Sequence, residues 1–189
     1  MRLLCVVLLT LSWCNSSFSQ VKMYSWEEAK TANPDTIFGI SFAKLKLEEL
    51  PVNLSDFVNL KRLDFSKNRF STLPISLKSL QKLEWIDFSS NRFESFPIVL
   101  TQLPLLKSII ANRNAFDRLP ESMGELKQLE LLDLWETPVS YFPESIYTIT
   151  NLKKIDLSGI RYSPTFQKKL QTRLPNTEII FDAPCDCME

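Results

Sequence analysis

Apolar residues recur along this chain in a fixed frame of 23 residues. Six copies of the frame begin at Ile37, Leu60, Leu83, Leu106, Leu129 and Leu152. In the second copy, apolar residues occupy positions 1, 4, 6, 11, 14, 18 and 21, asparagine occupies position 9 and proline position 15. We therefore expect a stack of similar units that bury one shared core.

The first six positions of each copy alternate between apolar and polar residues, as in Leu132-Asp133-Leu134. A period of two predicts one short, half-buried strand per repeat, and the stack makes these strands parallel. Asparagine stands at position 9 in three copies, as Asn68, Asn91 and Asn114. We expect its amide to bond backbone groups left unpaired where the chain turns, and Thr137 to do part of this.

A Leu-Pro or Phe-Pro pair at positions 14 and 15 begins the return in five of the six copies. The pairs are Leu50-Pro51, Leu73-Pro74, Phe96-Pro97, Leu119-Pro120 and Phe142-Pro143. Proline suits the first turn of a helix, so a short helical or 3₁₀ return is expected on the convex side. Phenylalanines in register at positions 6 and 11 are expected to stack through the core.

Both ends of the stack have residues suited to cover them. At the front, Ser25 and Glu28 form a predicted capping box, and Asn33-Pro34 ends the helix. At the back, the frame breaks after Tyr162, and we expect a helix at about 164–173 and a strand at about 178–181. The predicted divisions are a signal peptide at 1–19, an N-terminal cap at 20–36, repeats at 37–163, a C-terminal cap at 164–182 and a tail at 183–189.

These residues resemble the leucine-rich repeat family, in its 23-residue Leu-Pro class, over about residues 37–174. The repeats are similar to those of plant intracellular Ras-group, Scribble-type and Ras-suppressor-type proteins. The front cap and the N-terminal segment look more like small secreted bacterial members. The resemblance implies an α/β fold: a right-handed solenoid of about six repeats that binds proteins or peptides on its concave strand face, without catalysis and without a cofactor.

The first residues have the order of a secretory signal: Arg2, then the apolar run 3–11, then small and polar residues up to Ser19. The run is shorter than the roughly 20 residues that span a bilayer. We expect a soluble protein that is secreted, periplasmic or on the cell surface. A lipid anchor on Cys14 and a buried N-terminal element are the alternatives; without a signal, an intracellular scaffold is the expected role.

Removal of residues 1–19 would leave Cys185 and Cys187 as the remaining thiols. A disulfide framework is therefore not expected, nor is the cysteine-rich C-terminal cap of animal extracellular members. Two free thiols, an internal disulfide, an intermolecular bridge and half a zinc site remain open.

The exposed strand positions 3, 5, 7 and 8 should form the concave face. Its middle is predicted to be apolar with a charged rim, and this patch is our candidate partner-binding site. The candidate residues are Trp85, Asp87, Ile110, Arg113, Leu131, Asp133 and Trp135. The face measures roughly 400 Å² in projection, against about 800 Å² per side in a standard interface, so a peptide or loop fits best.

Composition weighs against other classes of function. The 22 basic and 22 acidic side chains cancel, which disfavours nucleic-acid binding. The chain has no histidine and three glycines, which disfavours catalysis and phosphate loops. Strand aspartates could share a calcium ion, although Arg62 and Lys154 offer them local partners. We expect no metal, and a structural or assembly role is the rival to binding.

Overall fold

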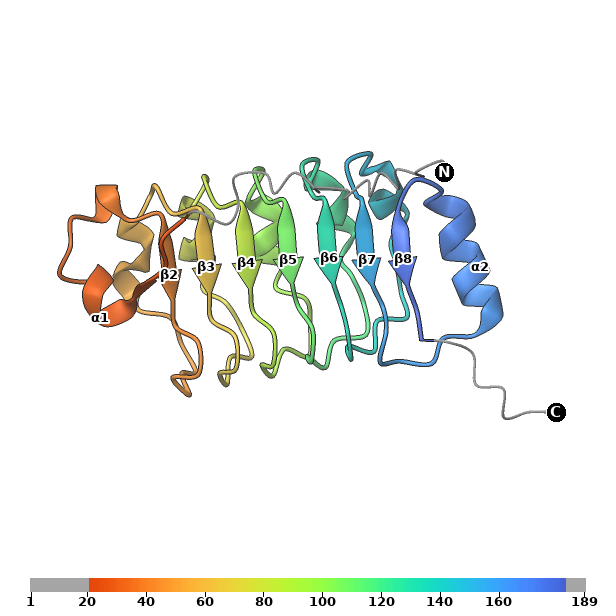
Figure 1. Ribbon diagram of the computed structural model, residues 1–189, viewed down its shortest axis with the longest axis horizontal. Coiled ribbons are helices and arrows are strands. Elements are labelled where there is room, and N and C mark those ends of the chain that lie inside the picture. The colour runs from red at the N-terminus through yellow and green to blue at the C-terminus, as the bar shows by residue number, and fades with distance from the viewer. Residues whose placement is uncertain (1–20, 183–189) are drawn as a thin grey trace, which may run out of the picture.

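The computed structural model describes residues 21–182, and its parallel strands form one sheet in sequence order (Figure 1). The strands are β1 (Tyr24–Ser25), β2 (Gly39–Ser41), β3 (Arg62–Asp64), β4 (Trp85–Asp87), β5 (Ser108–Ile110), β6 (Leu131–Asp133), β7 (Lys154–Asp156) and β8 (Glu178–Ile180). This is the predicted leucine-rich repeat solenoid, with one strand per repeat in β2 to β7.

Each residue of a repeat strand pairs with the equivalent residue, 23 positions later, in the strand of the next repeat. Leu63 of β3 lies opposite Ile86 of β4, and Ile86 lies opposite Ile109 of β5. The central residue of each repeat strand points into the core and is fully buried, so the two flanking residues point to the opposite face of the sheet. The 23-residue period thus places equivalent side chains in rows across the strands.

Short 3₁₀ turns form the other side of the repeats, as expected. They span Val52–Asp56, Ile75–Ser79, Ile98–Gln102, Glu121–Glu125 and Glu144–Thr148. Each proline lies one residue before the turn rather than inside it, which corrects its predicted place. The proline carbonyl accepts the first hydrogen bond of the turn; Leu77 N donates to Pro74 O at 3.1 Å, for example.

The position 9 side chains join consecutive repeats, which confirms their predicted role. Asn91 Nδ2 donates to Phe65 O of the preceding repeat at 3.0 Å and to Phe88 O of its own repeat at 3.0 Å. Its Oδ1 accepts from Phe70 N at 3.0 Å. Thr137 Oγ1 donates to Ala111 O at 3.2 Å, so a hydroxyl provides part of the same linkage.

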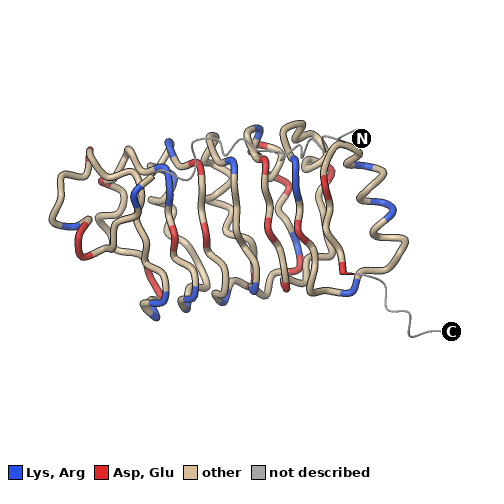
Figure 2. The backbone as a smooth tube through the Cα atoms, viewed as in Figure 1, with Lys and Arg blue, Asp and Glu red and all other residues tan. Residues whose placement is uncertain are grey.

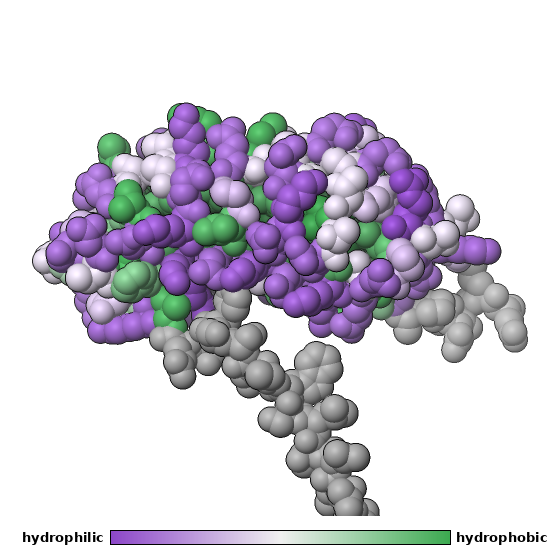
Figure 3. Space-filling model, turned by 90° about the horizontal axis from the view of Figure 1, so that it is seen from above, coloured by the Kyte–Doolittle hydropathy of each residue, from purple (hydrophilic) through white to green (hydrophobic). Residues whose placement is uncertain are grey.

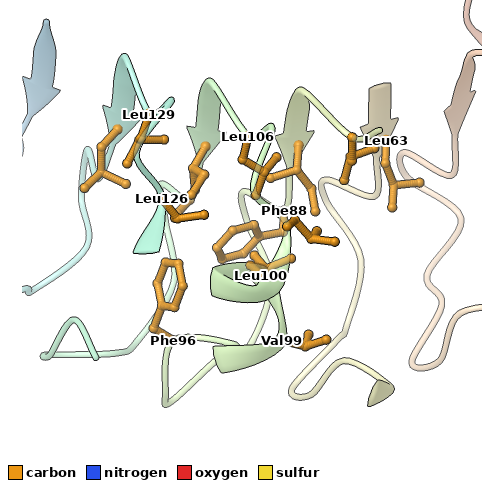
Figure 4. Close-up of a cluster of buried hydrophobic side chains, with 14 of the residues drawn as sticks. Leu63, Phe88, Phe96, Val99, Leu100, Leu106, Leu126 and Leu129 are labelled. Atoms are coloured by element: carbon orange, nitrogen blue, oxygen red, sulfur yellow. The ribbon is translucent and has the colours of Figure 1, made fainter. Parts of the chain in front are cut away.

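Phenylalanine rings pack between the sheet and the 3₁₀ turns (Figure 4). Phe65 and Phe88 stack at 6.0 Å between ring centroids, and Phe93 meets Phe88 edge-on at 5.3 Å. Phe96 bridges Phe88 and Phe116 at 6.0 and 5.7 Å. The predicted aromatic core is confirmed in these repeats.

Both end caps are present. Helix α1 (Trp26–Ala29) has the predicted capping box, with Glu28 N donating to Ser25 Oγ at 3.3 Å, and Trp26 packs against Phe42 at 5.3 Å. Helix α2 (Pro164–Arg173) matches the predicted range, and β8 follows it. The front strand β1 was not predicted; it extends the sheet beyond the first repeat by pairing Tyr24 with Ile40.

The predicted signal peptide at 1–19, Cys14, Cys185, Cys187 and the tail at 183–189 lie outside the described residues. Their assignments therefore stay predictions.

Candidate binding face

The strand face consists of the side chains at repeat positions 3, 5 and 7, which point away from the core. Six of the seven predicted site residues belong to it: Trp85, Asp87, Ile110, Leu131, Asp133 and Trp135. All six are half-buried. Arg113 is exposed and lies at position 8, where the chain leaves the sheet with a left-handed backbone, φ 55°.

Strand register separates the apolar side chains from one another. Ser108 lies between Trp85 and Leu131 in the position 3 row, and Ile110 lies between Asp87 and Asp133 in the position 5 row. Within the fifth copy, Asp133 at the end of β6 separates Leu131 of that strand from Trp135, two residues beyond it. The face is therefore a mosaic in which each apolar side chain has a polar or acidic neighbour.

An arginine stacks on each tryptophan of the strand face. Arg62 Cζ lies 4.5 Å from the Trp85 ring centroid, on the neighbouring strand. Arg113 Cζ lies 4.2 Å from the Trp135 ring centroid, and Arg113 Nε donates to Glu136 Oε2 at 2.7 Å. The electron-rich face of each ring attracts the guanidinium group, and the stacking restricts both side chains. Arg62 was missing from the predicted site.

The position 5 aspartates close the ends of the repeat strands. In each case, one carboxylate oxygen accepts a hydrogen bond from the backbone N–H two residues later. Asp64 accepts from Ser66 at 2.9 Å, Asp87 from Ser89 at 2.8 Å, Asp133 from Trp135 at 3.0 Å and Asp156 from Ser158 at 3.0 Å. The shared geometry gives these aspartates a structural function in the turn.

The carboxyl group of Asp87 lies in the middle of the acidic row. Its burial raises the pKa above the ordinary value of 3.8, and the negative charges of Asp64 and Asp133 act in the same direction. The hydrogen bonds from Ser89 oppose them without cancelling the rise. Because desolvation disfavours the charged form, ionised Asp87 lowers the stability of the folded protein.

A charge ladder runs along the edge where the strands begin. It consists of the position 2 residues Lys61, Glu84, Lys107, Glu130 and Lys153, which alternate in sign. Glu84 lies 3.6 Å from Lys61 Nζ and 2.7 Å from Lys107 Nζ, and Glu130 lies 2.7 Å from Lys153 Nζ. Although burial alone would raise the pKa of Glu84, Lys107 and Lys61 hold it below its usual value.

The ladder borders an open hollow of about 730 Å³ that also touches Arg62, Ser108, Leu131 and Lys154. When the molecule is viewed from the side of this edge, hydrophobic side chains form small separate patches among hydrophilic ones (Figure 3). The ladder was not predicted, although its sign alternation can be read from the sequence at the repeat period.

Residues 21–182, the part of the chain that the structure describes, contain neither a candidate metal site nor a candidate membrane-spanning helix. No group of three or more histidine, cysteine, aspartate or glutamate residues in this part of the chain is arranged to hold a metal ion. None of the helices described there has the length and apolar character needed to cross a membrane.

The leucine-rich repeat family model matches residues 59–80, the copy of the frame that shows the full pattern. The matched copy and the repeating strand-and-turn units together show a leucine-rich repeat fold. No curated protein matches its sequence significantly.

Solved structures of other leucine-rich repeat proteins share the fold. Internalin C2 from Listeria monocytogenes superposes with a TM-score of 0.55 at 19% identity, over 62% of this chain and 50% of that one. The Leptospira interrogans leucine-rich repeat protein LIC12759 gives 0.54 at 16% identity, over 85% and 58%. This leucine-rich repeat chain thus spans about half the length of the structures it resembles.

Proposed function

We propose that this leucine-rich repeat protein is a non-catalytic module that binds a protein or peptide outside the cytoplasm through its strand face. Leucine-rich repeat solenoids generally present such a surface to protein partners. The location outside the cytoplasm rests on the signal-like order of residues 1–19.

The stacked pairs on the strand face carry the proposal. Trp85 under Arg62 and Trp135 under Arg113 combine a large aromatic surface, a planar cation and a fixed orientation. Tryptophan and arginine are the residue types that contribute most to binding energy at protein interfaces. Because each side chain is already restricted before a partner arrives, little entropy is lost on binding.

The mosaic of the face favours an extended peptide or loop over a broad apolar domain surface. Such a segment would place apolar side chains beside Trp85, Ile110 or Leu131 and basic or amide groups beside the aspartates. The exposed area of the sheet, small against a standard interface, agrees with a partner of this size.

The test is capture of a partner by the immobilised secreted chain from its own culture supernatant and cell surface, followed by identification and an affinity measurement. Trp85→Ala with Trp135→Ala should weaken binding at least about tenfold, since truncated hot-spot residues cost about 2 kcal/mol or more. Tyr141→Ala is the matched control, because this exposed tyrosine lies in a turn away from the strand face.

Unchanged affinity in the double variant, with its thermal transition intact, would exclude the strand face as the binding site. The structural or assembly alternative has a different signature. If the protein is an assembly subunit, its size in solution rises with its own concentration, and no heterologous partner is retained.

A further inference from the structure

The protein carries equal numbers of basic and acidic side chains, 22 of each, yet the turns where the chain leaves the strands are strongly basic. This basic edge consists of repeat positions 8 and 10 in the first four copies. Six of these eight positions are basic and none is acidic: Lys44, Lys46, Lys67, Arg69, Arg92 and Arg113. All six side chains are exposed, and Figure 2 shows Lys and Arg at the tips of successive turns.

Backbone hydrogen bonds hold the two rows of the basic edge at the repeat spacing. In the position 8 row, Lys67 N donates to Ser89 O at 2.8 Å and Arg113 N to Trp135 O at 2.9 Å. In the position 10 row, Arg69 N donates to Leu47 O and Arg92 N to Phe70 O, both at 2.8 Å. Equivalent residues of adjacent copies are therefore about 4.8 Å apart at their backbones, and Ser90 interrupts the position 8 row between Lys67 and Arg113.

Few of these cations are neutralised within the protein. Arg69 lies 3.8 Å from Glu48, and Arg113 pairs with Glu136 at 2.7 Å. In the part of the chain that the structure describes, Lys44, Lys46 and Lys67 have no ion-pair partner. Like charges at this spacing repel one another, so binding of an external polyanion would lower the electrostatic energy of the row.

The backbone makes the basic residues costly. Lys44, Lys46, Lys67 and Arg113 all have left-handed conformations, with φ between 55° and 63°. This region suits glycine or asparagine and costs other residues about 1 kcal/mol each. Ser90 (φ 54°) and Glu136 (φ 51°) share this conformation, so the turn itself imposes it, and lysine and arginine occupy it against their local preference.

We propose that the basic edge binds a linear anionic polysaccharide that lies along the row of turns. Acidic residues border the edge on both sides, so the positive strip is narrow and suits a chain better than a broad anionic surface. They are Asp64 and Asp87 on the strand face, and Glu48, Glu94 and Asp117 beyond the turns.

The tips of the turns also distinguish a polysaccharide from a lipid bilayer. Position 9 lies between the two basic rows, and there Asn68, Asn91 and Asn114 turn their amides inward onto backbone carbonyls. Leu45, 52% exposed, is the apolar exception at the first turn. Peripheral membrane contacts combine basic residues with apolar side chains that enter the acyl region, and the remaining turns lack them.

Heparin, a sulfated polysaccharide, is the probe, with uncharged dextran as its control. In the full chain, Lys44→Gly, Lys67→Gly and Arg92→Gln together should lower heparin affinity at least about tenfold. The slope of log affinity against log salt should fall by roughly one per cation removed. Glycine suits the positive φ at both lysines, so this triple variant should fold at least as well as the parent.

The matched control removes the same charge elsewhere, as Lys78→Gln, Lys168→Gln and Lys169→Gln, and should bind heparin within about twofold of the parent. Absence of parent binding, an unchanged edge variant, or equal losses in both variants would overturn the proposal. So would stronger binding to phosphatidylserine vesicles than to heparin, which would assign the edge to a bilayer. Trp85→Ala alone should leave heparin binding intact, because the cation on that ring is Arg62 and not a residue of the basic edge; this variant separates the basic edge from the strand face.

Discussion

The guanidinium carbon of Arg113 lies 4.2 Å from the centre of the Trp135 ring, and a backbone hydrogen bond of 2.9 Å from Arg113 N to Trp135 O fixes the two repeats beside each other. An exposed pair of this kind contributes about 0.5–1 kcal/mol. A double-mutant cycle with Arg113→Ala and Trp135→Ala, measured by urea unfolding, should return a coupling of that size. Strictly additive effects would show that the stack does not stabilise the fold.

Loss of the Asn91 amide should destabilise the stack. Asn91→Ala removes three donated bonds and one accepted bond, which link Phe65, Phe88 and Ser89 carbonyls with Phe70 N. We expect a loss of about 3 kcal/mol in urea unfolding, because backbone groups remain unpaired in a poorly hydrated turn. Asn151→Ala, which removes one exposed bond to Lys127 O, is the control and should cost about 0.5 kcal/mol. Equal costs for the two variants would contradict the linking role.

Substitutions at position 8 should have opposite effects according to residue. Ser90 has φ 54°, so Ser90→Gly should stabilise the protein by about 0.5 kcal/mol. Gly159 has φ 84°, and an added Cβ would lie 2.6 Å from Glu136 Cγ and 3.0 Å from Glu136 N. Gly159→Ala should therefore cost about 2 kcal/mol. Thermal melts of both variants test the pair, and a shift in the same direction would be unexpected.

Asp87→Asn should raise the melting temperature at pH 7. Since the fold raises the pKa of Asp87, the folded state binds its proton more tightly, and stability falls as pH rises through that pKa. Asparagine avoids the buried charge and keeps an oxygen for Ser89 N. The gain should vanish below the ordinary pKa of 3.8, where Asp87 is neutral in both states. A gain that persists at low pH would point to packing instead.

Glu84→Gln should show the opposite dependence on pH. Lys107 and Lys61 hold the pKa of Glu84 below its ordinary value of 4.5, so ionised Glu84 stabilises the fold above that value. This contribution is lost as pH falls through the lowered pKa. The variant should therefore be less stable than the parent by about 0.5 kcal/mol at pH 7, with the difference closing in acid. Melting temperatures of the parent and the variant over a series of pH values test this prediction; a variant as stable as the parent at pH 7 would contradict it.

The sequence predicts the repeated parts of the fold well because the same residue pattern recurs in several copies. The 3₁₀ turns follow the Leu-Pro and Phe-Pro pairs, and Asn68, Asn91 and Asn114 bond as their amides suggest. Helix α2 also spans its expected residues, although it lies outside the repeats. Strand β1 has two residues and pairs only with β2, so no periodicity could signal it. The left-handed turns were also hidden, because lysine and arginine occupy positions that glycine usually marks.

The site was harder to predict than the fold. Repeat positions correctly separate inward from outward side chains, and so place Trp85, Ile110 and Leu131 on the strand face. They do not show that Ser108 separates Trp85 from Leu131, or that Arg62 covers Trp85, because these depend on pairing register and side-chain rotamers. The aspartates bond the backbone two residues later, a local geometry that their charge alone does not reveal.

The charge ladder has a period twice as long as that of the repeats. Its signs alternate from one copy to the next, so the pattern returns only after 46 residues, from Lys61 to Lys107 and on to Lys153. Excision of the single copy 83–105 would bring Lys61 beside Lys107, whereas excision of 83–128 would bring Lys61 beside Glu130. A chain of this design can therefore be lengthened or shortened without electrostatic conflict by pairs of repeats, and not by one.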